Sequence, residues 1–134
     1  MALSVHEALV HIMVVTASSD DGISEHELDV IRRLIARSPV FAGFDASQLA
    51  TVANAAVDAT NAMGLEAVID MAVTALPGRL QDTAYALAVE VAVVDVDLPQ
   101  EELRLLEMLR DRLDTDRLVT AAIEASARAR MRRL

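Results

Sequence analysis

Glycine and proline are scarce along this chain, and their scarcity limits the folds open to it. The 134 residues include only four glycines and three prolines, too few for the many tight turns of an all-β sandwich or barrel. Hydrophobic residues make up 54% of the chain but aromatic residues only 2%, so aliphatic side chains and alanine must fill the core. Such a core favours closely packed helices. The length fits a single domain over residues 1–134, built around one core.

Two sequence signals mark helix starts. Ser4 is followed three residues later by Glu7, and Ser24 is followed in the same way by Glu27. This spacing is typical of a capping box, in which the serine hydroxyl and the glutamate carboxylate each accept a bond from an otherwise unpaired backbone N–H. We expect an all-α, compact bundle of about seven helices, over residues 5–18, 24–38, 45–63, 65–76, 79–95, 99–113 and 114–134.

The fifth predicted helix, "RLQDTAYALAVEVAVVD", is apolar nearly all round, which indicates a central position. Its valines also suit a strand, but the segment is longer than an ordinary strand and rich in alanine. Glu90 interrupts it. A buried carboxylate without a partner is costly, so we expect an arginine beside Glu90.

An internal repeat appears when the chain is placed on itself with an offset of 75 residues. "VVTASSDDGISEHELDVIRRLIAR" then aligns with "VEVAVVDVDLPQEELRLLEMLRDR", and each copy reads Asp-x-x-(Ile/Leu)-x-x-x-Glu between an apolar and an amphipathic helix. The repeat halves span about residues 5–38 and 80–113. The pattern predicts a pseudo-two-fold helix-turn-helix duplication, with Ile23 and Leu98 tucking each turn onto the core.

Four repeated acids are the candidate site: Asp20, Glu27, Asp95 and Glu102. Packing of both turns onto the core predicts that these carboxylates share one surface region. Carboxylates brought together in this way repel one another, and a hard cation with oxygen ligands relieves that repulsion. With no His or Cys among the four, Ca²⁺ or Mg²⁺ is favoured over zinc. Helix capping explains the same residues without a metal, and both interpretations stay open. The EF-hand motif does not fit, because placing Gly22 at its sixth position puts Ala17 and Leu28 at its two ends.

The remaining signals exclude several classes of protein. The net charge of −9 argues against nucleic-acid binding, and the four arginines near residue 130 suit the C-terminal end of a helix. Neither a Gly-x-Ser-x-Gly turn nor a phosphate-binding glycine loop is present, so we expect no enzymatic activity.

His6 and His11 are five residues apart, which turns them away from a shared metal, and His26 is expected to be exposed in a first helical turn. With no apolar run of about 18 residues and no cationic signal region, a cytoplasmic location is expected and no membrane insertion.

The words "ASSDDGISEHELDVIRRL" and "AVVDVDLPQEELRLLEML" resemble the TerB-like family, which is associated with bacterial tellurite resistance. The acidic turn of that family typically reads Asp-Gly-x-(Ile/Val)-(Ser/Thr)-x-x-Glu. Here Asp21 stands at the glycine position, and the second turn has no glycine. The resemblance implies an all-helical domain with pseudo-symmetric halves, a role in metal-related stress, and a divalent-cation site at the four acids named above. Related domains also occur beside J-domains in membrane-anchored co-chaperones.

The sequence therefore predicts a non-enzymatic stress-response module, associated with tellurite resistance, that binds a divalent cation weakly and acts by protein–protein interaction. The alternative is a purely structural or oligomerisation bundle of the co-chaperone type, with no metal site. A protein partner is expected in the first case, with its identity left open, and self-association is open in both.

Overall fold

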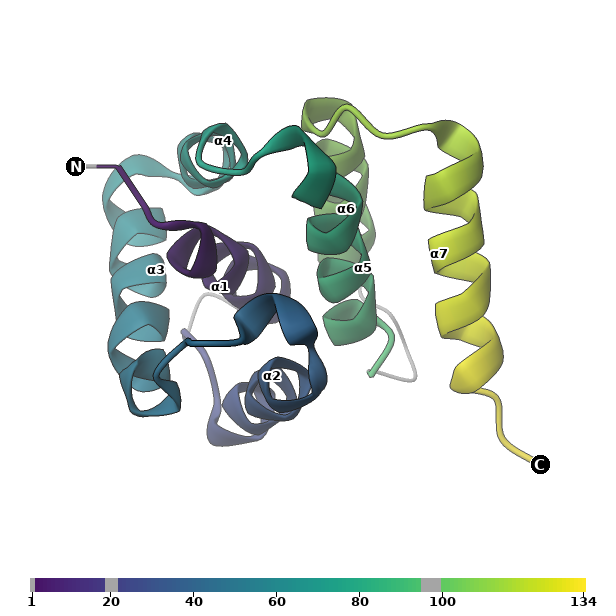
Figure 1. Ribbon diagram of the computed structural model, residues 1–134, viewed down its shortest axis with the longest axis horizontal. Coiled ribbons are helices and arrows are strands. Elements are labelled where there is room, and N and C mark those ends of the chain that lie inside the picture. The colour runs from purple at the N-terminus through teal and green to yellow at the C-terminus, as the bar shows by residue number, and fades with distance from the viewer. Residues whose placement is uncertain (1, 19–21, 95–99) are drawn as a thin grey trace.

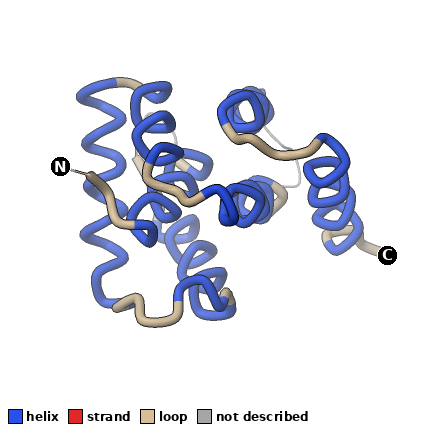
Figure 2. The backbone as a smooth tube through the Cα atoms, turned by 45° about the horizontal axis from the view of Figure 1, so that its top comes forward, coloured by secondary structure: helices blue, strands red, loops and turns tan. Residues whose placement is uncertain are grey.

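The computed structural model describes residues 2–18, 22–94 and 100–134, without the side chains of residues 100–102. Within these ranges the chain forms helices and no strand (Figures 1 and 2). The α-helices are α1 (Val5–Ala17), α2 (Glu25–Arg37), α3 (Leu49–Met63), α4 (Leu65–Thr74), α5 (Gln81–Ala92), α6 (Gln100–Arg112) and α7 (Arg117–Arg130). Short 3-10 turns precede α3 and α5 and follow α2. The prediction of an all-α bundle is confirmed.

Both capping boxes form as the sequence predicts. The Ser24 hydroxyl accepts from the Glu27 backbone N–H at 3.1 Å, and Glu27 Oε1 accepts from the Ser24 N–H at 2.8 Å. Ser4 and Glu7 make the same pair of bonds at 3.1 and 2.9 Å. Each pair satisfies two backbone donors that a helix start leaves unpaired, and so fixes where α1 and α2 begin.

Helix α1 lies at the centre of the bundle, where it contacts every helix from α2 to α6 (Figure 1). All its residues from Ala8 to Ala17 are buried. Its two buried polar side chains bond within the helix: Thr16 Oγ1 donates to the Ile12 carbonyl at 2.8 Å, and His11 Nδ1 lies 2.7 Å from the Glu7 carbonyl oxygen. Because these groups need no outside partner, α1 can be surrounded on all sides.

Helix α5 is the second buried helix and packs directly against α1. Its predicted central position is confirmed, although it shares the centre with α1. Helices α2 and α6 instead bury one face each. The buried aliphatic residues of α2 are Leu28, Ile31, Leu34 and Ile35, and those of α6 and the turn after it are Leu105, Leu106, Leu109 and Leu113.

Helix α7 lies at one edge of the molecule (Figure 1) and packs mainly on α5. Asp116 begins it by accepting from the Leu118 backbone N–H at 2.8 Å. Along the described parts of the chain, no helix combines the length and the apolar character that crossing a bilayer requires.

Candidate functional site

The first acidic turn joins α1 to α2. Asp20 lies outside the described residues, which resume at Gly22. Gly22 has a φ of +92°, a backbone conformation that side chains with a Cβ rarely adopt. Ile23 follows it, half-buried and packed against the core. The prediction that Ile23 packs against the core is therefore confirmed, whereas Leu98, its counterpart in the second turn, lies outside the described residues.

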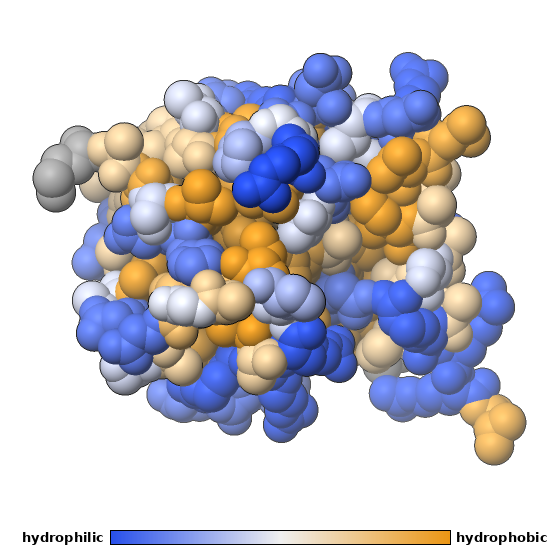
Figure 3. Space-filling model, viewed as in Figure 1, coloured by the Kyte–Doolittle hydropathy of each residue, from blue (hydrophilic) through white to orange (hydrophobic). Residues whose placement is uncertain are grey.

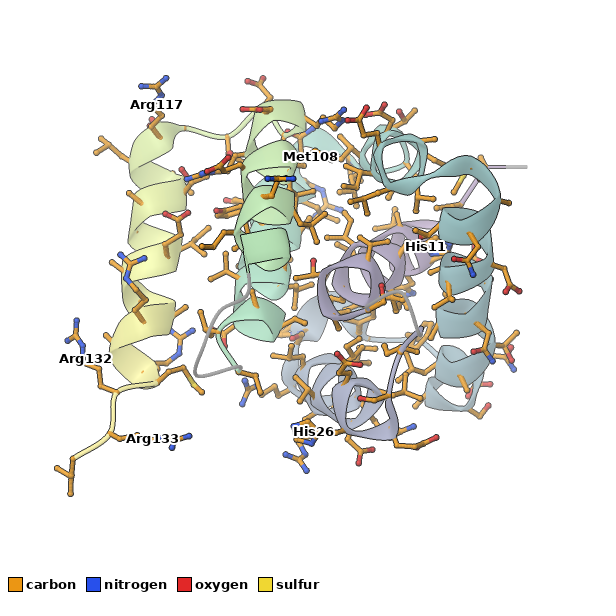
Figure 4. All side chains as sticks on the ribbon, turned by 180° about the vertical axis from the view of Figure 1, so that it is seen from behind. His11, His26, Met108, Arg117, Arg132 and Arg133 are labelled. Carbon is orange, nitrogen blue, oxygen red and sulfur yellow. The ribbon has the colours of Figure 1, made fainter. Side chains whose placement is uncertain are left out.

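Glu27 is the one candidate ligand whose side chain the structure describes. It is half-buried in the first turn of α2, and its Oε1 is held by the capping bond from Ser24. A carboxylate offers about four acceptor sites on two oxygens, so one capping bond does not exhaust its capacity to bind a cation. The nearby His26 is exposed on α2, as expected (Figure 4).

The second acidic turn lies between α5 and α6. Asp95 is outside the described residues, and Glu102 lies within α6 with its side chain also outside them. The shared surface of the four carboxylates and the pseudo-two-fold duplication therefore stay predictions. Within the part of the chain that the structure describes, no three His, Asp or Glu side chains come together in a way that could hold a metal ion.

The two histidines of α1 have separate surroundings. His6 Nε2 lies 2.8 Å from the Val40 carbonyl oxygen, and its ring stacks on Phe41 with the ring centres 5.4 Å apart. His11 is buried and bonded within α1. Each ring thus has a structural role beside a different part of the chain.

A family model for tellurite resistance protein TerB matches residues 6–125. The chain belongs to the TerB family. Searches of curated proteins and of solved structures give no match.

The TerB match spans both repeat halves over most of their length, and it includes all four candidate acids. The sequence resemblance rested on two short acidic segments, whereas the family match extends over α1 to α6 and most of α7. The family assignment therefore applies to the whole helical bundle.

Within this TerB domain, Glu90 has the arginine partner that the sequence predicts. Its carboxylate forms an ion pair with Arg130 of α7. The side chain of Glu90 is only 22% exposed, so the pair neutralises a charge that is mostly removed from water. This contact fastens the end of α7 to α5.

Sequence reasoning missed a second polar cluster in the TerB domain, made by Tyr85, Glu124 and Arg110. The Tyr85 hydroxyl donates to Glu124 Oε1 at 2.6 Å, and Arg110 Nη1 donates to the same oxygen at 3.1 Å. Burial raises the pKa of Tyr85 above its ordinary value, and the Glu124 carboxylate raises it further. The single tyrosine in an apolar helix could have indicated this cluster, because a buried phenol hydroxyl usually has a hydrogen-bond partner.

The cluster borders a cavity of about 550 Å³ between α6 and α7. Its lining combines two arginines, three carboxylates and two threonines: Arg110, Arg117, Glu107, Asp111, Glu124, Thr115 and Thr120. Within this lining Arg110 forms an ion pair with Glu124, and the same carboxylate oxygen is also bonded to Tyr85. The arrangement joins α5, α6 and α7, and we assign it a structural role.

Proposed function

We propose that this TerB-family domain is a non-enzymatic interaction module whose helix packing responds to Ca²⁺ or Mg²⁺. In this proposal Asp20, Glu27, Asp95 and Glu102 bind the cation weakly at the two acidic turns. Binding changes the surface that the domain offers to a protein partner in a tellurite-resistance-associated stress response. The family assignment supports the association with tellurite resistance, and the cation and the partner are our inference.

One observation carries the proposal: each acidic turn connects a buried helix to a helix that buries only one face. The first turn leads from α1 to α2, and the second leads from α5 to α6. Helices α1 and α5 pack on each other in the core, where close packing resists displacement. Helices α2 and α6 rest on that core through one aliphatic face. A change of charge in the turns therefore acts on the two helices that are freer to move.

In the proposal the cation acts by relieving electrostatic repulsion between carboxylates. The chain carries 21 acidic side chains and a net charge of −9, so nearby carboxylates repel one another at neutral pH. A divalent cation removes that repulsion and draws the carboxylate oxygens around itself. In the proposal this sets the angle of α2 on the core, and with it the outward face of α2 that carries Arg32 and Arg33.

The alternative function is a structural bundle whose acids only cap helices, and the first capping box favours it. Glu7 makes the same two bonds with Ser4 that Glu27 makes with Ser24. Yet Glu7 is outside the repeated acidic motif. Glu7 therefore shows that capping alone can explain a glutamate three residues after the capping serine.

A variant series separates the two functions. Glu27→Gln keeps the capping box, since glutamine caps as glutamate does, but it removes the charge. Glu7→Gln is its matched control, with the same local geometry outside the acidic turns. Asp20→Asn combined with Asp95→Asn removes one charge from each turn.

The Tm of each variant is measured by thermal unfolding at increasing concentrations of CaCl₂ and of MgCl₂. At a hundredfold excess over the dissociation constant, a cation that binds only the folded state adds about 2.7 kcal/mol, or roughly 10 °C in Tm for a domain of this size. We expect this increase for the parent and Glu7→Gln, a reduced one for Glu27→Gln, and none for the Asp20/Asp95 double variant. No increase in the parent at millimolar cation, or an equal increase in the double variant, would establish the structural alternative.

A further inference from the structure

Helix α7 has an apolar face on the side that points away from the protein. It packs on the bundle through Thr120, Ile123 and Ala127, which are buried or half-buried. At about 100° per residue, the opposite face carries four residues without charge or polarity: Leu118, Ala122, Ala125 and Ala129. All four are exposed, and Leu118 is 79% exposed.

This face departs from what an edge helix normally presents to water. The outward side of a surface helix is ordinarily charged or polar, and a helix that is apolar on both sides is usually covered on both. Of the large hydrophobic side chains exposed at α7 and after it, Leu118 lies on this face, whereas Val119, Met131 and Leu134 lie beside it or beyond the helix. Figure 3 shows apolar surface over the upper part of α7 and hydrophilic residues around its lower end.

Charge is also distributed unevenly along α7. Its N-terminal end lies among the exposed carboxylates of Asp111, Asp114 and Asp116, with Arg117 as a cation beside them. The opposite end carries four arginines: Arg128, Arg130, Arg132 and Arg133. Figure 4 shows Arg117 at one end of the helix and Arg132 and Arg133 at the other. Arg130 is bound to Glu90, and the other three of these arginines are exposed.

We propose that the outward face of α7 binds α7 of a second copy of this chain, in antiparallel orientation. Centring the pair between Ala122 and Ala125 places these two residues opposite each other across the interface. Leu118 of each copy then lies over Ala129 of the other, so that a large side chain fills the space above a small one. Spacings of four, three and four residues along this face match the seam of a helix pair.

The charges fix both the orientation and the occupant. In the antiparallel pair, the end of one α7 that carries Asp114 lies nearest the end of the other that carries Arg132 and Arg133, and the same approach repeats at the far end. The face is thus complementary to itself, as a two-fold interface requires. A parallel pair would place aspartates beside aspartates. A nucleic acid or an anionic membrane would attract the arginines but be repelled by the aspartates.

The interface is small, which sets its strength. A helix of 14 residues is only about 21 Å long, and one helix face buries less than the ~800 Å² per partner of a standard stable interface. We therefore expect a weak dimer, populated at about 100 μM to 1 mM and not at nanomolar concentration.

Sedimentation equilibrium from about 10 μM to 1 mM tests the association. The average mass measured for the parent chain should rise from that of the monomer toward twice that value as the concentration increases. Ala125→Glu, which puts a carboxylate at the centre of the seam, should stay monomeric throughout. Ala55→Glu is the matched control on the exposed side of α3, and it should dimerise like the parent. A parent chain that stays monomeric at 1 mM, or an Ala125→Glu chain that dimerises equally, would overturn the proposal.

Disulfide cross-linking tests the orientation, since the chain has no cysteine of its own. Chains with Leu118→Cys and chains with Ala129→Cys are oxidised separately and as a mixture. The antiparallel pair predicts cross-linking mainly in the mixture, because two copies of position 118 lie roughly 16 Å apart along the axis, beyond the ~7 Å Cα limit of a disulfide. Cross-linking within each single variant would contradict the orientation. Binding of the monomer to vesicles of anionic lipid through Leu118, without self-association, would replace the second copy with a membrane.

Discussion

Leu9→Ala is expected to reduce the free energy of unfolding by about 2–5 kcal/mol, the cost of emptying a close-packed site. Leu9 is fully buried in α1, the helix that contacts all helices from α2 to α6. A cavity at this position therefore removes contacts from the centre of the bundle, where the surrounding helices cannot all move inward.

Urea denaturation at micromolar protein concentration measures this loss. Leu118→Ala is the matched control, because it is the same substitution on a helix but at a side chain that is 79% exposed. The control should change stability by less than about 0.5 kcal/mol. Similar losses for the two variants would mean that α1 is not the centre of the core.

Alkaline pH should destabilise the protein through Tyr85 alone. The chain has twelve arginines and three histidines but neither lysine nor cysteine. Tyr85, the single tyrosine, is therefore the only side chain whose ordinary pKa lies between about 8.5 and 12. Burial, and then the hydrogen bond to Glu124, raise its pKa in the folded protein.

The direction of the effect follows from proton linkage. Above about pH 10 the unfolded chain releases the phenol proton, whereas the folded protein keeps it. The stabilisation is complete below that pH and falls as the pH rises, by up to about 1.4 kcal/mol per pH unit, until Tyr85 ionises in the folded state.

Urea denaturation between pH 9 and pH 12 should show this decline in the parent chain, and phenolate absorbance should appear only on unfolding. Tyr85→Phe should show a nearly flat profile over the same range, because phenylalanine has no proton to release. An equal decline in Tyr85→Phe would contradict the assignment.

The helix starts could be predicted because their causes are local. Ser4 and Glu7, like Ser24 and Glu27, are three residues apart and make their bonds within one turn, so the sequence contains both partners side by side. The same locality explains why α2 could be predicted to be amphipathic. The last helix was predicted to begin earlier, at about residue 114, but Asp116 caps it so that it begins at Arg117.

For contacts between distant segments, the sequence predicts the type of partner residue but not its position in the chain. The cost of burying Glu90 indicates an arginine, but nothing local selects Arg130, forty residues away. Tyr85 and Glu124 are separated by 39 residues, and their bond was missed. The sequence predicted an apolar helix before the first acidic turn but assigned the central position only to the fifth helix; the structure shows that α1 shares that position.

The four candidate acids were named from the repeat, and the structure describes the side chain of one of them. Glu27 occupies the capping position that the sequence assigns to it. Whether the two acidic turns meet depends on how two distant segments approach, which a repeat pattern indicates but does not measure.

The most direct test of the cation-responsive module is a ¹H–¹⁵N NMR titration of the parent chain with Ca²⁺ and with Mg²⁺. Backbone amides of residues 18–28 and of residues 93–103 should shift together, along one saturating curve that gives a single dissociation constant. The Asp20→Asn, Asp95→Asn variant should lose both sets of shifts. Saturable shifts in only one of the two turns, or no saturable shifts at millimolar cation, would contradict a site formed by both acidic turns.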